Sequence, residues 1–166
     1  MDKDIDDKER VARILSQDWF EGGNLLHIAF ALNYGETYLS VNRLASPSYY
    51  SDVQSFVAKH KEYAFGDQQG EYRRAVLNVG DVRSISITHV GKVLAVNVEV
   101  EPRDSHTKSH AGIFTRYKQK NLKKGESLFI EHSEEIACDV ILLKLQRFLL
   151  RLSTLETGEL ENSGKE

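Results

Sequence analysis

The strongest constraint on the fold of this chain is a set of three short apolar runs in the middle of the sequence. The runs are rich in β-branched residues, and Gly80-Asp81 and Gly91 mark the short turns between them; they span Glu71–Val79, Val82–Thr88 and Lys92–Glu101. Turns this short connect antiparallel neighbours, because parallel strands need a longer crossover connection. The three runs therefore predict an antiparallel meander.

Two segments with helical periodicity complete the predicted fold. Ser46-Pro47 is typical of a helix start, with Ser as the N-cap and Pro at the first helical position. Ser133 is predicted to cap a longer helix over residues 134–153, and further strands are predicted over 10–15, 25–32, 36–42 and 112–117. The start of segment 25–32 fits a helix equally well. The fold class that follows is α+β: a single domain with a mainly antiparallel sheet, one mid-chain helix and a long C-terminal helix packed on the sheet.

The distribution of charge sets the expected limits of the domain. Residues 1–9 carry a net charge of −3, residues 154–166 carry another −3, and the remaining residues, 10–153, carry +3. Acidic ends are typical of solvated termini. We therefore expect a disordered N-terminus over 1–9, a single α+β domain over 10–153 and a flexible acidic tail over 154–166.

The composition favours a cytoplasmic protein. The first ten residues, MDKDIDDKER, are charged where a signal peptide would be apolar, and no apolar run approaches the ~20 residues of a membrane span. Cys138 is the only cysteine, which excludes an internal disulfide and a multi-cysteine zinc site.

The stretch Val98–Gly112 gathers groups that can bind a metal or move a proton. An alternating strand ends at Pro102, and a polar loop follows it. Imidazole and carboxylate groups suit a divalent metal, and two histidines can also serve as general acid and base. Histidines in a polar loop can instead be solvated or shape the loop. The catalytic candidates are His110, His106, Asp104 and Glu101; the metal candidates are His106, His110 and Asp104.

Positive charge is concentrated beside this loop. Between residues 103 and 124 there are seven Lys or Arg residues and a single acid, with two aromatic residues interleaved. Single-stranded nucleic acid is held by cations that neutralise phosphates and by aromatic rings on which bases stack. A solvated basic face is the alternative. The predicted nucleic-acid or phosphate contacts are Arg103, Lys108, Arg116, Tyr117, Lys118, Lys120, Lys123 and Lys124.

A third set of residues suggests a different enzyme. Arg13, Ser40 and the Glu99-Val-Glu101 segment occur in the same order as the Arg, Ser and Glu-x-Glu of arginine-type ADP-ribosyltransferases, which this arrangement resembles. In that family the Arg and Ser bind NAD and the last glutamate orients the ribose hydroxyl. This sequence has Leu39-Ser40-Val41 where the family has Ser-Thr-Ser, and strand alternation alone accounts for the two glutamates.

The predicted C-terminal helix is apolar on two sides. One broad arc, which includes Ile141, Leu145 and Leu149, is wide enough to dock the helix on the sheet. A second stripe lies on the opposite side and predicts a homodimer interface across a two-fold axis; it consists of Ile136, Val140, Leu143 and Leu150. A loop of the same chain that covers the stripe, such as residues 118–126, is the alternative.

Three fragments of the chain together resemble a set of small bacterial proteins. They are IAF…YLSVNR (residues 28–43), GDVRSISI (80–87) and EPRDSHTKSHAGI (101–113). Members of the set share an aromatic residue followed by a Leu-Ser-Val strand and, later, a Pro-containing loop that ends in His-Ala. The resemblance implies a bacterial origin and favours His110 over His106, but it implies no activity.

These features favour a binding module that uses its basic surface for nucleic acid or another polyanion and its C-terminal helix for a protein contact. The alternative is a phosphate-ester or nucleotide-processing enzyme. In that enzyme His110 and His106 act as base and acid or as metal ligands, and Asp104 orients one imidazole. Arg103 or Arg116 then binds the phosphate of the substrate. An ADP-ribosyltransferase-like enzyme is the third possibility.

Overall fold

A seven-stranded antiparallel sheet organises the protein. The structure is a computed structural model that describes residues 4–32, 36, 38–89, 94–103, 107–119 and 139–160. The strand order is β6-β7-β8-β4-β1-β5-β9, with every neighbouring pair antiparallel. The strands are β1 (Arg10–Ile14), β4 (Leu39–Arg43), β5 (Glu71–Asn78), β6 (Ser86–His89), β7 (Leu94–Pro102), β8 (His110–Gln119) and β9 (Thr154–Glu159). The α+β fold class is confirmed.

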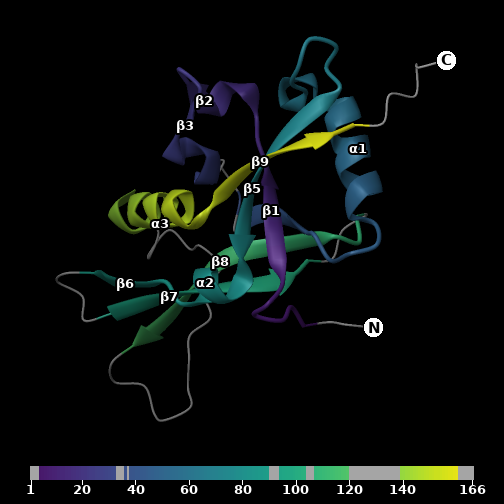
Figure 1. The fold of residues 1–166 in the computed structure, drawn as a ribbon. Coiled ribbons are helices and arrows are strands. Elements are labelled where there is room, and N and C mark those ends of the chain that lie inside the picture. Colours follow the sequence, from purple (N-terminus) through teal and green to yellow (C-terminus); the bar gives the residue numbers. More distant parts are fainter. Residues whose placement is uncertain are drawn as a thin grey trace.

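Three α-helices accompany the sheet within the described part of the chain: α1 (Tyr49–Lys59), α2 (Val79–Arg83) and α3 (Asp139–Leu152). Figure 1 shows α1 and α3 on opposite sides of the molecule, and strands β7 and β8 crossing β1 and β5 at a steep angle. A small hairpin of β2 (Phe20–Glu21) and β3 (Asn24–Leu25) and three short 3-10 segments complete the fold: η1 (Gln17–Trp19), η2 (His27–Phe30) and η3 (Lys61–Tyr63). No helix in the described ranges is both long and apolar enough to span a membrane.

The two faces of the sheet are packed differently. The first face carries the main core, to which alternate residues of most strands contribute, including Val11, Val41, Leu77, Val98 and Ile113. Helices α2 and α3 and segment η2 also contribute to this core. The second face carries a smaller cluster under α1, formed by Ala12, Ile14, Tyr49, Val53, Val57, Ala64 and Tyr72. Because strand side chains alternate between faces, the residues between those of the main core point toward the second face.

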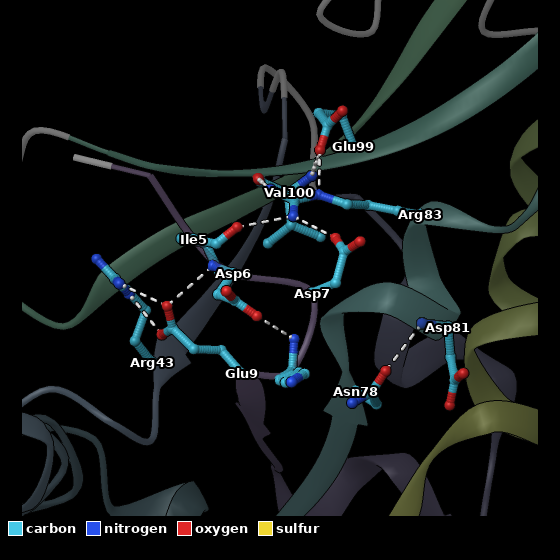
Figure 2. Close-up of polar contacts among 11 residues, drawn as sticks. Ile5, Asp6, Asp7, Glu9, Arg43, Asn78, Asp81, Arg83, Glu99 and Val100 are labelled. Atoms are coloured by element: carbon cyan, nitrogen blue, oxygen red, sulfur yellow. Dashed lines mark hydrogen bonds and ion pairs between the residues drawn. The ribbon is translucent and has the colours of Figure 1, made fainter. Parts of the chain in front are cut away.

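The acidic N-terminus is part of the fold, which contradicts the expected disorder for residues 4–9. The side chain of Ile5 is 3% exposed and belongs to the main core. Figure 2 shows the two arginines that hold this segment. Arg43 donates to Glu9 with Nε and Nη2 at 3.0 and 2.8 Å, and Arg83 donates to the Ile5 carbonyl and to Asp7, both at 2.7 Å. The acids are therefore paired with cations from distant parts of the sequence.

The expected flexible C-terminal tail is also wrong for residues 154–159, because they form edge strand β9. Arg74 of β5 donates to Glu156 with Nε at 3.0 Å and Nη2 at 2.7 Å. Opposite Tyr72, β9 has Gly158, and a Cβ atom there would overlap the Tyr72 ring. The pairing thus depends on a glycine at this position.

Two predicted strands have a different local structure. In the segment 25–32, Leu25 belongs to the short strand β3, and residues 27–30 form the 3-10 segment η2 in place of a strand. The segment 82–88 begins as helix α2, because Asn78 caps its first turn by accepting a hydrogen bond from the Asp81 N–H at 3.0 Å. Strand β5 lies between β1 and β9 and is not next to β6, so only the pairing of β6 with β7 remains of the predicted meander.

Helix α3 does not expose an apolar stripe along its described length. Ile141, Leu145 and Leu149 are buried. Of the predicted dimer stripe, Leu143 and Leu150 are half-buried, and Leu150 packs against the main core; Ile136 and the Val140 side chain lie outside the described residues. Segment η2 lies against the helix, where its Phe30 lines a small cavity together with Leu142 and Leu145 of α3. The exposed side of α3 carries Lys144, Arg147, Arg151 and Leu152.

Candidate functional site

The candidate site lies on the second face of the sheet, where β4 pairs with β8. The register places Ser40 opposite Gly112 and Asn42 opposite His110. Ser40 alternates with two residues of the main core, Leu39 and Val41, so its side chain points to the second face. There, Ser40 Oγ lies 3.1 Å from His110 Nε2. This hydrogen bond joins two residues that are 70 positions apart in the sequence.

Aromatic rings and one arginine surround this pair. The rings of Tyr38 and His110 have their centroids 5.6 Å apart. The Arg103 guanidinium carbon lies 4.6 Å from the Tyr38 centroid and 4.8 Å from the Phe114 centroid. Cation–π contacts of this kind favour a fixed position for an arginine side chain. The positive charge of Arg103 is therefore held beside the Ser40–His110 pair.

Gly112 creates the space in which this arrangement fits. A Cβ atom at Gly112 would lie 2.6 Å from Tyr38 Cδ2 and 2.9 Å from Arg103 Nε. Both side chains thus cross β8 at the residue directly opposite Ser40. A glycine inside a strand often marks such a close approach, and here it brings Arg103 next to the row that contains Ser40.

A buried polar network fixes the residue immediately before His110. Asp52 Oδ2, in the first turn of α1, accepts hydrogen bonds from the Ser109 N–H at 3.0 Å and from Ser109 Oγ at 2.6 Å. Asn42 Nδ2 donates to the same Ser109 Oγ at 2.8 Å. Ser109 is fully buried. Because these bonds come from β4 and α1, they fix the start of β8 and with it the backbone of His110.

Ser40 is supported from the opposite face of the sheet. The Arg13 guanidinium, on β1, donates to the Ser40 carbonyl oxygen at 2.9 Å and to the Ala29 carbonyl oxygen at 3.0 Å. Its guanidinium carbon also lies 4.9 Å from the Trp19 ring centroid. Arg13 therefore ties the Ser40 backbone to η2 and stays on the side of the main core.

The electrostatic setting of His110 favours its neutral form. Burial lowers the pKa of the imidazole, and the nearby positive charge of Arg103 lowers it further. Within the described residues, the buried Nδ1 atom has no hydrogen-bond partner. A neutral imidazole has one N–H and one lone pair. When the proton is on Nδ1, the lone pair of Nε2 is available to the Ser40 hydroxyl.

Only some of the predicted site residues lie together. Arg103 and His110 share the site, and Glu101 is one strand away, opposite Gly112. Lys108 is exposed on the turn before β8. Arg116, Tyr117 and Lys118 belong to β8, although the structure does not describe their side chains. Asp104, His106, Lys120, Lys123 and Lys124 lie outside the described residues. In the part of the chain that is described, no three His, Cys, Asp or Glu side chains are grouped for a metal ion.

The residues of the ADP-ribosyltransferase-like pattern do not meet at one site. Arg13 and Ser40 are on neighbouring strands, but their side chains point to opposite faces of the sheet. Glu99 forms an ion pair with Arg83, which also donates to the Val100 carbonyl oxygen at 2.9 Å. Arg13 and Glu99 are therefore engaged in contacts that stabilise the fold.

The sequence patterns do not connect Ser40 with His110, nor do they single out Tyr38, Asp52 or Ser109. The one local signal is Gly112, a glycine within a predicted strand. Comparisons of the chain with family models, curated proteins and solved structures give no match. The function is therefore inferred from the geometry and charge of the described residues.

Proposed function

We propose that this protein binds a polyanion, in the first place single-stranded nucleic acid, through a basic surface formed by β8 and α3. The observation that carries the proposal is the exposed side of α3. Its three charged residues are Lys144, Arg147 and Arg151, and all three are cations. Their spacing of three and four residues places them on one side of the helix.

The two basic elements lie near each other. Thr115 of β8 and Gln146 of α3 line the same small cavity. The described residues 107–119 and 139–153 contain six cations, Lys108, Arg116, Lys118 and the three of α3, and a single acid, Asp139 at the first position of α3. A group of cations in excess over acids attracts phosphates and releases counterions when it neutralises them.

Titration of a labelled single-stranded RNA, followed by fluorescence anisotropy at several salt concentrations, tests the proposal. The triple variant Lys144→Gln, Arg147→Gln, Arg151→Gln is expected to bind at least ~10-fold more weakly. If each cation neutralises one phosphate, the slope of log affinity against log salt falls by about 2, because single strands contribute ~0.7 per phosphate. A second variant, with Gln at Lys118, Lys120, Lys123 and Lys124, tests whether the cations at the end of β8 and after it also contribute to RNA binding.

The matched control removes three exposed cations from elsewhere: Lys8→Gln, Lys59→Gln, Lys61→Gln. It has the same net charge as the α3 triple variant and is expected to bind like the parent protein. Equal losses in both triple variants indicate a general charge effect and contradict a defined surface. Absence of binding by the parent at low ionic strength refutes the proposal altogether.

A further inference from the structure

We propose that Ser40 and His110 form a catalytic pair that hydrolyses carboxylic esters, with Ser40 as the nucleophile and His110 as its general base. This activity is separate from polyanion binding, which uses the cations of β8 and α3. The starting observation is the distance of 3.1 Å between Ser40 Oγ and His110 Nε2. That distance is within the range in which a base activates a serine hydroxyl.

Both members of the pair are held by neighbours that come from other elements. Arg13 binds the carbonyl of Ser40 from the face with the main core. Asp52 and Asn42 bind Ser109, the residue before His110. Nucleophilic catalysis depends on such fixed placement, because much of the rate acceleration comes from reacting groups that are already oriented before the reaction.

The pair is also within reach of a substrate. Ser40 and His110 are each half-buried, so that neither is sealed in the core. The Tyr38 ring, which is also half-buried, lies beside the imidazole and offers an apolar surface to the acyl or alkyl part of an ester. The second-face cluster under α1 does not include these residues.

A positive charge lies in the neighbourhood of Ser40. Arg103 Nε is 2.9 Å from the Cβ position of Gly112, the cross-strand partner of Ser40. Cβ positions of such partners are about 4.5–5.5 Å apart, so this nitrogen is within about 8 Å of the Ser40 Cβ atom. Over such a distance the charge of Arg103 favours the negative charge of a tetrahedral intermediate without a direct hydrogen bond.

The chemical steps need only the ester and water. Ser40 Oγ attacks the carbonyl carbon, and its proton moves to His110 Nε2. The bond between the carbonyl carbon and the alkoxy oxygen then breaks, and the leaving alkoxide takes the proton from Nε2 to become an alcohol. Water next attacks the acyl group on Ser40, with His110 accepting its proton. That proton returns to Oγ as the carboxylic acid leaves and the free serine is restored.

The charged and titratable groups around His110 set the expected pH profile. They are Arg103 beyond β7, Tyr38 before β4, Asp52 on α1 through Ser109, and Glu101 on β7. Because the pKa of His110 is below its usual value of 6.5, the base is neutral at pH 7. The rate of reaction at Ser40 is therefore expected to be constant near neutral pH and to fall only below about pH 6.5.

The test uses a serine-reactive fluorophosphonate, whose P–F bond is replaced by a P–O bond to the attacked serine with release of fluoride. Peptide mass spectrometry locates the adduct, and hydrolysis of 4-nitrophenyl acetate gives an independent rate. The variants are Ser40→Ala and His110→Gln, and the control is Ser55→Ala, an exposed serine of α1. Circular dichroism verifies that each variant is folded.

The expected result is an adduct on Ser40 in the parent and in Ser55→Ala, and none at this position in Ser40→Ala. In His110→Gln the labelling rate is expected to fall by at least ~100-fold, the lower range for general-base assistance. If His110→Gln does not fold, the pH dependence of Ser40 labelling in the parent tests the role of His110 as the general base. An unlabelled Ser40 in the folded parent, equal labelling in His110→Gln, or a labelling rate that already falls with a midpoint above pH 6.5 overturns the proposal.

Discussion

Replacing Asp52 by Ala is expected to destabilise the protein through the buried serine to which Asp52 is bonded. Asp52 Oδ2 accepts three hydrogen bonds: from the Ser109 N–H, from Ser109 Oγ and from Ser48 Oγ at 2.9 Å. Ser48 is half-buried, so water can replace its lost partner. Ser109 has an exposed fraction of 0%, so its N–H and hydroxyl lose their acceptor without access to water.

The magnitude follows from these two donors. Each buried polar group that is left without a partner costs about 1–3 kcal/mol. Some relaxation is expected around the smaller side chain, and we therefore predict a loss of about 2–4 kcal/mol in the free energy of unfolding. For a chain of this length, that loss corresponds to a decrease of about 5–15 °C in the melting temperature. Asp52→Asn keeps a carbonyl acceptor and is expected to lose about half as much.

Urea unfolding followed by circular dichroism measures the loss, and a thermal scan gives the melting temperature. Asp67→Ala is the matched control, because Asp67 is an exposed acid; its effect is expected within about 0.5 kcal/mol. A loss below about 0.5 kcal/mol in Asp52→Ala, with an unchanged denaturant slope, refutes the reasoning that Ser109 depends on this carboxylate. The support of His110 by α1 would then also be refuted.

Three further predictions concern other parts of the fold. Gly112→Ala is expected to cost about 1–3 kcal/mol in urea unfolding, because its new methyl group meets the Tyr38 ring; an unchanged stability contradicts the close packing. Glu9→Gln is expected to lower stability at neutral pH. The pKa of Glu9 is held below 4.5, chiefly by the hydrogen bonds from Arg43, so the contribution of the pair is present above pH 4.5 and is lost as the pH falls below it. The difference between parent and variant should therefore narrow in acid, and a constant difference contradicts this pairing. Finally, the predicted homodimer through α3 is tested by light scattering of the parent at micromolar concentration, where the mass of one chain contradicts it. Leu150→Glu is expected to unfold more easily in either case, because Leu150 packs against the main core.

The elements that the sequence predicts correctly are those whose signals are local. Strands β1, β5 and β7 follow from short runs of β-branched residues. Helix α1 is also present, but it begins at Tyr49 with Ser48 as its N-cap, two residues after the predicted cap Ser46. The termini were predicted incorrectly because composition does not show pairing. Arg83 and Arg74, which hold residues 5–7 and Glu156, are far from them in the sequence.

The candidate site shows the same limit. The polar loop after Pro102 identifies His110 from its local context. Its hydrogen-bond partner Ser40 appears only when β4 and β8 are paired, and that register is set by packing on the main core. Asp52 has no chemical signal in the sequence either, because an acid in the first turn of a helix is common for reasons of the helix dipole alone.

The ordered termini bear directly on the position of the basic surface. Three acids of the two ends are paired with arginines of the body: Glu9 with Arg43, Asp7 with Arg83 and Glu156 with Arg74. These pairs neutralise cations of β4, α2 and β5. By contrast, the described residues form no ion pair with Lys144, Arg147 or Arg151. Lys144, Arg147 and Arg151 lie within two turns on one side of α3, a length of about 10 Å and thus about one Debye length at 0.1 M salt, so their fields reinforce one another.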